Sequence, residues 1–268
     1  TLDSSGNGNH LSMIGFSGVL DPSTAPIEGA TGTGVHFDGT DDEFNSTDFP
    51  STVASDTAGS ISIWGRIDSD SGNREHVFAV ARDADATATY LHVSWDMVSG
   101  RKRLNVELTA DGTGQWRWIG SNDSLLGHVG RWLHVVISHN GTTPTIYMDG
   151  VVHTGSFVVS TDKTKWFKAV AADATSDADI MSIGSLPSNG SASAFFAGSL
   201  DDIRVYSDAL SANEALGLYN LHRNEPIGSG TDPGAANLVG HWKLDKGDTR
   251  SIEFDGDDDS VNIRADSS

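Results

Sequence analysis

Short runs of β-branched and aromatic residues, separated by turn residues at intervals of about 8 to 12 positions, constrain the fold of this chain most strongly. Ser60–Trp64, Tyr90–Trp95 and Leu104–Leu108 alternate between apolar and polar residues, as a strand with one covered face does. Trp132–Ser138 is more continuously apolar, which indicates a strand covered on both faces. The pattern therefore predicts an all-β fold of antiparallel strands, in a sandwich or a barrel.

Two local signals predict a hairpin and a helix. Asp149 and Gly150 separate the strand-like Thr145–Met148 from Val151–His153, and an Asp-Gly pair supplies the positive φ angles of a two-residue primed turn. Ser211 and Glu214 have the Ser-x-x-Glu spacing of a capping box. Leucines and alanines follow at helical spacing, so we expect one short helix from about 212 to 222.

Composition excludes several classes of partner. The chain has no cysteine and therefore no disulfide framework or thiolate metal site. Its 37 acidic and 17 basic residues give a formal net charge of −20, which repels nucleic acid. The one short basic cluster, Arg101–Arg103, is predicted in a solvated hairpin turn. No apolar run approaches the ~20 residues that span a bilayer, so we expect no membrane insertion.

The chain divides near residue 225. Residues 225–236 have no periodic apolar face and are predicted to be a linker, which assigns residues 1–224 to a first domain. The segment 251–261 repeats the segment 34–44, with Phe-Asp-Gly-x-Asp-Asp in both. Residues 237–268 are therefore either the opening strands of a second, incomplete copy or a strand that completes the first sandwich.

Six motifs follow one another along residues 1–222: Asp3–Asn9, Phe37–Gly39, Ser60–Trp64, Arg131–Val135, Tyr147–Gly150 and Gly198–Tyr206. Together they resemble the laminin-G-like jelly-roll domains of the concanavalin A-like lectin/glucanase superfamily, relatives of the pentraxins. The resemblance implies a two-sheet antiparallel jelly-roll sandwich with one short C-terminal helix.

One opening strand departs from the family pattern. Domains of this kind usually begin with a strand like Val-x-x-Trp-x-Leu-Asp before the first turn, and here such a strand occurs at Val239–Asp245. The first domain has either lost its opening strand or borrows this one, from its own chain or from a neighbour. Borrowing from a neighbour would be strand addition at an exposed edge, which links subunits.

Oxygen-bearing side chains gather in three of the six motifs. Calcium takes six to eight oxygen ligands, at about 2.3–2.6 Å, from carboxylates, amides and carbonyls. The resemblance implies an ion that joins these segments, with Asp38, Asp42 and Asp201 as ligands and Asn7 in support. The alternative is that Asp and Asn in turns hydrogen-bond to their own backbone.

Catalysis lacks its usual carboxylates. Laminarinase-like enzymes with this sandwich cleave sugars with two carboxylates in a Glu-x-Asp-x-Glu-like strand. The glutamates with no such neighbourhood are Glu28, Glu43, Glu75, Glu107, Glu214, Glu225 and Glu253. The sequence also has no His-Glu-x-x-His zinc motif and no Gly-x-Ser-x-Gly elbow. We therefore expect no enzymatic activity.

Two aromatic pairs are candidates for ligand binding. Trp116 and Trp118 share one face of a predicted strand, and Trp166 and Phe167 lie in the long polar stretch 156–179. The alternative is that both pairs pack on the scaffold.

The leading hypothesis is an extracellular carbohydrate- or glycoprotein-binding adhesion module, secreted or on a cell or virion surface and stabilised by calcium. The alternative hypothesis is a structural assembly protein, in a virion or a cell-surface layer, that exchanges strands between subunits.

Overall fold

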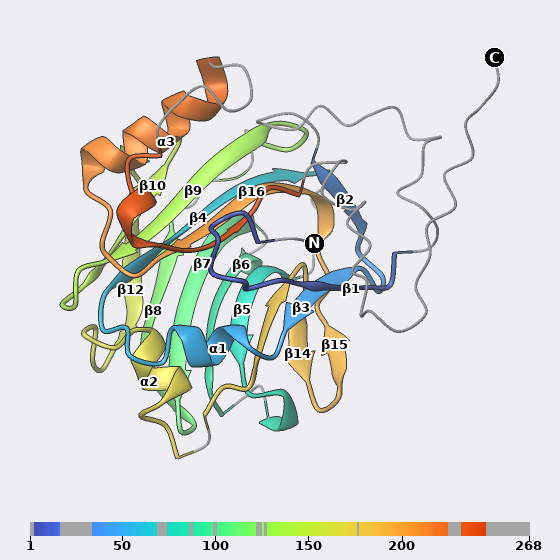
Figure 1. Cartoon of the computed structure of the whole chain (residues 1–268), viewed down its shortest axis with the longest axis vertical. Coiled ribbons are helices and arrows are strands. Elements are labelled where there is room, and N and C mark those ends of the chain that lie inside the picture. Colours follow the sequence, from blue (N-terminus) through green and yellow to red (C-terminus); the bar gives the residue numbers. More distant parts are fainter. Residues whose placement is uncertain are drawn as a thin grey trace.

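The computed structural model describes residues 3–16, 34–68, 74–85, 88–98, 101–121, 125, 128–175, 177–224 and 232–244. These residues form two antiparallel sheets that face each other across one apolar core, with helices at the margins (Figure 1). The predicted all-β sandwich is confirmed. Within the described residues, no helix combines the length and the apolar character needed to cross a membrane.

One sheet has eight strands, and its centre is a meander in which β5, β6, β7 and β8 pair in sequence order. In spatial order the strands are β1 (Ser12–Ile14), β3 (Glu43–Ser46), β13 (Ile180–Ile183), β5 (Glu75–Ala81), β6 (Tyr90–Val98), β7 (Arg101–Ala110), β8 (Thr113–Gly120) and β12 (Gly155–Ser160). A separate hairpin of β14 (Leu186–Ser188) and β15 (Ser191–Ser193) lies beside β5.

The second sheet has seven strands, and most of its neighbours are distant in sequence, as in a jelly roll. Its strands are β11 (Val151–Val152), β10 (Pro144–Met148), β9 (Trp132–His139), β4 (Gly59–Ile67), β16 (Ala197–Tyr206) and β17 (Leu238–Trp242), with β2 (Val35–Asp38) also paired to β16. The predicted hairpin is confirmed, because Asp149 and Gly150 have φ angles of 49° and 76° between β10 and β11.

Three α-helices and two 3₁₀ turns accompany the sheets: α1 (Phe49–Thr52), α2 (Phe167–Ala171), α3 (Ala212–Asn224), η1 (Asp83–Asp85) and η2 (Ala235–Asn237). The helix predicted from the capping box is α3, in which Ser211 N–H donates to Glu214 at 2.8 Å. The structure adds two short helices that the sequence did not predict. Both α1 and α2 are single turns, too short to show helical periodicity in the sequence.

The core lies between the sheets because alternate side chains of each strand point to opposite faces. Leu91 and Val93 of β6 and Ile61 and Ile63 of β4 belong to one buried cluster. Gly65 of β4 lies against the ring of Trp95, where a Cβ would collide with it. The other face of the seven-stranded sheet is covered by α3, whose Leu218 packs in a second apolar cluster.

Strand β17 is held on both sides within the same chain. One edge pairs with β16, and on the other side the turn that begins at Asp3 binds its backbone. Asp3 Oδ1 accepts the N–H of His241 at 2.9 Å, and Ser4 N–H donates to His241 O at 2.7 Å. The indole of Trp242 is fully buried and donates to Asn9 O at 2.7 Å. In this structure β17 thus fills the sheet edge beside β16 within the same chain.

The division into domains stays a prediction. Residues 225–231 of the expected linker, and the repeated segment 251–261, lie outside the described residues. The 3₁₀ turn η2 begins within the last residues of the expected linker. Asp232, also in that linker, accepts hydrogen bonds from Arg204 and Tyr206.

The basic cluster Arg101–Arg103 is not a solvated turn, and that prediction is wrong. These residues begin β7, and Lys102 is 2 % exposed. Its ammonium lies 2.8 Å from Glu75 of β5, which is equally buried. The sequence pattern missed this pair because the partners are 27 residues apart. Such a pair is costly to break, since either charge alone would be buried without compensation.

If β17 is part of the folded domain, Trp242→Ala should lower the free energy of unfolding by about 3–5 kcal/mol, because it removes a buried indole and leaves a cavity. Chemical denaturation followed by circular dichroism measures this. Val151→Ala, at a residue 67 % exposed, is the control and should change stability by less than ~0.5 kcal/mol. Equal effects of the two substitutions would show that β17 does not pack as described.

Candidate functional site

The outer face of the eight-stranded sheet carries a polar cluster on its central meander. Leu91, Val93 and Trp95 of β6 point into the core, so the intervening residues point away from it. We define the outer-face cluster as these outward residues and their bonded neighbours: Arg74, His76, Tyr90, His92, Ser94, Asp96, Asn105, Glu107 and Arg117.

Two arginines meet one carboxylate at the centre of the cluster. Arg74 Nη2 lies 2.7 Å and Arg117 Nη2 lies 2.8 Å from Oδ2 of Asp96. Arg117 also donates through Nε to Asn105 Oδ1 at 2.7 Å. Register explains the contact, since Asn105 faces Ser94 of β6 on one side and β8 on the other. The arginines are thereby fixed in position although their side chains remain 38 % and 24 % exposed.

A second carboxylate, that of Glu107, lies two residues along β7 from Asn105. The hydroxyl of Tyr90 donates to Glu107 Oε1 at 3.0 Å, and Arg117 Nε lies 3.4 Å from Oε2. The ring of Tyr90 stacks on His92, with centroids 4.9 Å apart and an interplanar angle of 9°. Burial raises the pKa of the Tyr90 phenol, which therefore stays a neutral donor. Phenol, carboxylate and guanidinium thus form one fixed group.

Arg74 stays charged although it is partly buried. Burial opposes the charge of Arg74, but the hydrogen bond to Asp96 and the charges of Asp96 and Glu107 outweigh it and raise its pKa. The two guanidinium groups are matched by two carboxylates. The cluster therefore offers both charged donors and charged acceptors.

Two imidazoles are buried beneath this polar layer. His76 and His92 pack edge to face with centroids 4.6 Å apart, and each is 1 % exposed. Burial, and then the positive charge of Arg74, lower the pKa of His76 to about 4. Burial and nearby positive charges also lower the pKa of His92 well below its ordinary value. Both rings are therefore neutral at pH 7.

A hydroxyl-rich ligand suits this arrangement chemically. Arginine and tyrosine donate, and carboxylate oxygens accept, so vicinal hydroxyls can be bound from both sides. The mutual hydrogen bonds hold the side chains in place, which lowers the entropy lost on binding. The outer-face cluster is our candidate ligand site.

A second candidate is an aspartate cluster where the chain passes from β2 to β3, and so from one sheet to the other. Carboxylate oxygens of Asp38, Asp41 and Asp42 lie within 4.8 Å of one another, and this group could hold a metal ion. Asp42 accepts the N–H of Asp38 at 2.8 Å. Burial raises the pKa of Asp42; that hydrogen bond opposes the rise, and the charges of Asp38 and Asp41 add to it.

The other two predicted metal ligands lie elsewhere. Asp201 faces Trp64 in the β16–β4 register, four residues along β16 from the partner of Asp38, a distance of about 13 Å. Asn7 instead donates through its amide to Leu238 O at 2.8 Å, and so holds β17. Asp41, which the sequence-based ligand set left out, takes the place next to Asp38 and Asp42.

The four aromatic residues predicted to bind ligand are buried. Trp116 and Trp118 of β8, Trp166, and Phe167 of α2 are all members of the core cluster. Trp116 and Trp166 stack with an interplanar angle of 10°, and Trp116 donates to Lys165 O at 2.8 Å. Because the rings close the core at this end, none of the four presents an exposed face for a sugar.

Sequence reasoning missed the outer-face cluster although a signal was present. The alternation of Tyr90–Trp95 and Leu104–Leu108 marks His92, Ser94, Asn105 and Glu107 as outward positions on adjacent strands. Glu107 was interpreted as an isolated glutamate because its partners come from two other strands. Pairing the alternating runs would have found them.

The structure is a two-sheet jelly-roll sandwich with a polar cluster on one outer face. A comparison with protein families agrees with this fold. A family model described as the concanavalin A-like lectin/glucanases superfamily, Laminin_G_3, matches residues 38–215. The chain belongs to this superfamily. A search of curated proteins found no match.

Solved structures share the fold at low sequence identity. The CBM40 domain of a Ruminococcus gnavus IT-sialidase, bound to α2,3-sialyllactose, has a TM-score of 0.55 and 16 % identity, covering 69 % of this chain and 96 % of that one. Domain 4 of AbnA, an extracellular GH43 arabinanase from Geobacillus stearothermophilus, in complex with arabinotriose, has a TM-score of 0.55 and 17 % identity, covering 81 % and 91 %. Tailspike protein 2 of Escherichia coli O157:H7 bacteriophage CAB120 has a TM-score of 0.56 and 17 % identity, covering 80 % and 27 %.

The buried His76 gives stability a defined pH dependence. Its folded-state pKa is about 4, against an ordinary value of 6.5, so only the unfolded state gains this proton as the pH falls through that window. This group should therefore cost about 2–3 kcal/mol of stability between pH 7 and pH 4.5. Denaturant titrations at the two pH values measure the loss, which should be smaller by that amount in His76→Gln.

The control is Val151→Ala, at an uncharged residue that is 67 % exposed. It should keep the wild-type pH dependence. An identical pH dependence in His76→Gln would mean that His76 is not a buried neutral group.

Proposed function

We propose that this protein is a non-catalytic carbohydrate-binding module that binds a glycan on the outer-face cluster. The observation that carries the proposal is the fixed, partly exposed group of Arg117, Glu107 and Tyr90 beside Arg74. Its donors and acceptors match the hydroxyl groups of a sugar.

The same contacts argue against catalysis at the cluster. Sugar hydrolysis needs one carboxylic acid free to give up a proton and a second carboxylate across the bond. Asp96 is occupied by two arginines, and Glu107 by an arginine and a tyrosine. Both carboxylates are thus arranged for binding.

The fold comparisons support a binding role without fixing the ligand. Two of the structures of this fold are complexes with oligosaccharides, sialyllactose and arabinotriose, and one of them is a domain of an extracellular enzyme. We extend this to the present chain as a secreted or surface-exposed module with a glycan or glycoprotein partner.

Assembly by strand exchange is the second candidate function, and the position of β17 is the observation that bears on it. The strand lies at the end of its sheet and is joined to α3 through residues 225–231. Exchange would require β17 to leave β16 and the turn at Asp3, and the buried Trp242 with it. Binding by a closed monomer requires no such loss, so we favour it.

Calcium is the ion we propose at the aspartate cluster of Asp38, Asp41 and Asp42. Three carboxylates supply the hard oxygen ligands that Ca²⁺ prefers, and carbonyls or water would complete the shell. A cation would also offset the like charges that raise the pKa of the buried Asp42. Its role would be to hold the β2–β3 crossing and so to stabilise the sandwich.

Glycan binding is tested by array screening followed by calorimetry on the best ligand, with sialyllactose and arabinotriose as reference compounds. Arg117→Ala should weaken binding by about tenfold or more, because it removes a charged donor worth roughly 1.5–3 kcal/mol. Tyr90→Phe removes only a hydroxyl and should weaken binding by a few fold.

The matched control is Arg131→Ala, at an exposed arginine just before β9 of the other sheet. It should leave affinity unchanged. Absence of binding to any glycan, or equal losses in Arg117→Ala and Arg131→Ala, would rule out the outer-face cluster as the site.

Calcium is tested by thermal melting with the ion and with excess chelator. Calcium should raise Tm by roughly 5 °C at saturation, because it binds only the folded state. Asp42→Asn, which can still accept the hydrogen bond from Asp38, should lose most of this shift, whereas the exposed Asp177→Asn should keep it. A wild-type melt that does not respond to calcium would remove the ion from the proposal.

A further inference from the structure

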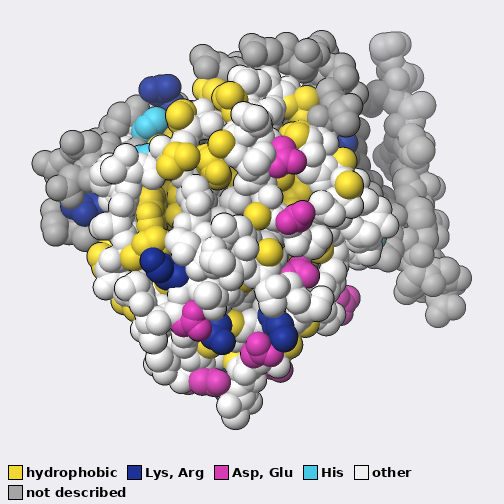
Figure 2. All heavy atoms as spheres, turned by 90° about the vertical axis from the view of Figure 1, so that its left-hand side faces the viewer, with side chains coloured by type: hydrophobic (Ala, Val, Ile, Leu, Met, Phe, Trp, Pro, Cys, Tyr) yellow, Lys and Arg dark blue, Asp and Glu magenta, His cyan; other side chains and the backbone are white. Residues whose placement is uncertain are grey.

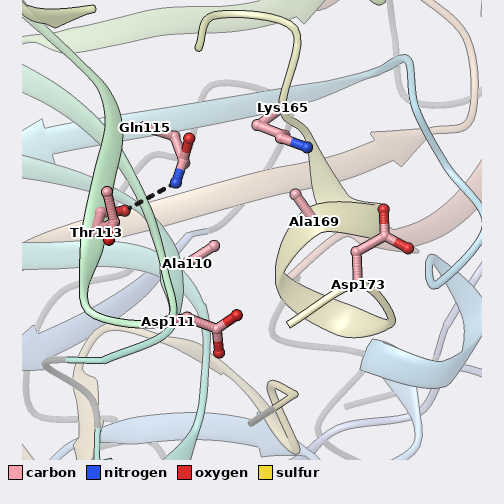
Figure 3. A pocket seen from close by; sticks show the side chains of 7 residues that line it. All are labelled: Ala110, Asp111, Thr113, Gln115, Lys165, Ala169 and Asp173. Atoms are coloured by element: carbon pink, nitrogen blue, oxygen red, sulfur yellow. Dashed lines mark hydrogen bonds between the residues drawn. The ribbon is translucent and has the colours of Figure 1, made fainter. Parts of the chain in front are cut away.

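A separate cleft of about 280 Å³ opens between the β7–β8 hairpin and α2. Figure 3 shows its two walls, with Asp111, Thr113 and Gln115 on the hairpin side and Lys165 and Asp173 on the side of α2. Ala110 belongs to the hairpin side and Ala169 to α2. The cleft adjoins the outer-face cluster along β8, since Gln115 is two residues, or about 7 Å, from Arg117, but none of its lining residues belongs to that cluster.

Hydrogen bonds tie the two walls of the cleft together. Asp162 N–H donates to Gln115 O at 3.0 Å, and the indole of Trp116 donates to Lys165 O at 2.8 Å. Thr175 N–H donates to Asp111 Oδ1 at 2.8 Å, which ties the segment after α2 to the hairpin. The cleft is therefore a built feature of this end of the sandwich.

The cleft combines an apolar floor with a polar rim. The methyl groups of Ala110 and Ala169 are small enough to leave space between the walls. The side chains of Gln115, Lys165 and Asp173 offer an amide, an ammonium and a carboxylate around that space. A sugar ring has the same division, with C–H groups on its faces and hydroxyls at its edge.

We infer that this cleft is a second carbohydrate subsite, which takes a single neutral sugar ring. Its volume lies just below the ~300–1,000 Å³ of sites for drug-sized ligands, which limits the occupant to about one ring. Two carboxylates against one ammonium disfavour an acidic sugar. The inference rests on the proposed glycan-binding function but assigns it a second, chemically different position.

Two residues that line this cleft, Gln115 and Lys165, directly precede Trp116 and Trp166 in the sequence. Trp116 and Trp166 turn into the core, which leaves Gln115 and Lys165 on the cleft side. The lower part of the view in Figure 2, around α2, likewise presents acidic and basic side chains together. The long loop predicted to hold a ligand thus contributes polar side chains in place of aromatic ones.

The test is a titration of the full chain with the methyl glycosides of arabinose, galactose and glucose, followed by amide shifts in ¹H–¹⁵N spectra. At least one glycoside should move the amides of residues 110–115 and 165–173, with a dissociation constant in the millimolar range. The double variant Gln115→Ala with Lys165→Ala should weaken this binding by about tenfold, because it removes two hydrogen-bonding groups. Lys163→Ala, at a nearby lysine that lies over Phe157, is the matched control and should bind as the wild type does.

The variant Arg117→Ala separates this inference from the proposed function. Cleft shifts should persist in Arg117→Ala, whose substitution lies in the other site. Shifts confined to residues 90–96, 105–107 and 117 of the outer-face cluster, and lost in Arg117→Ala, would overturn the cleft and keep the proposed function. Cleft shifts weakened equally by Lys163→Ala would overturn the assignment of the rim, and an absence of shifts in both regions would overturn both sites.

Discussion

The packing of two sheets on one apolar core fixes the direction of almost every other side chain in this structure. Once Leu91, Val93 and Trp95 point inward, His92 and Asp96 must point outward. The same constraint acts on β7 and β8, so antiparallel register brings outward residues of three strands into contact. The outer-face cluster is thus a consequence of the core and not of any contiguous motif.

The two outer faces differ in exposure because, among the described residues, a helix covers only the outer face of the seven-stranded sheet. On the seven-stranded sheet, α3 covers Tyr206 and Val136, and the charges of Arg204 are met by Asp202 and Asp232. On the eight-stranded sheet, the arginines of the cluster remain a quarter to two fifths exposed. The ion pairs of Arg204 are buried, whereas those of Arg74 and Arg117 are partly exposed to solvent. We therefore propose ligand binding on the outer face of the eight-stranded sheet.

The sequence predicted the fold well and the sites poorly, for one physical reason. Strand alternation, the Asp149–Gly150 turn and the capping box before α3 are local signals, and the structure contains all three. The outer-face cluster also depends on which residues of β6, β7 and β8 face one another, and alternation within each strand does not specify that register. Lys102 illustrates this, because its burial follows from Glu75 on β5 and not from its basic neighbours.

Aspartates in turns show how the same residue type can serve two physical roles. Asp3 accepts backbone N–H groups from Ser5 and Asn9 in its own turn, and from His241 of β17. These bonds together outweigh burial and lower the pKa of Asp3. Burial raises the pKa of Asp42, the charges of Asp38 and Asp41 add to the rise, and its one backbone bond only partly opposes it. A carboxylate with enough backbone donors needs no cation, whereas a buried one beside like charges is stabilised by a cation, and this difference supports calcium at the place where the oxygens of Asp38, Asp41 and Asp42 converge.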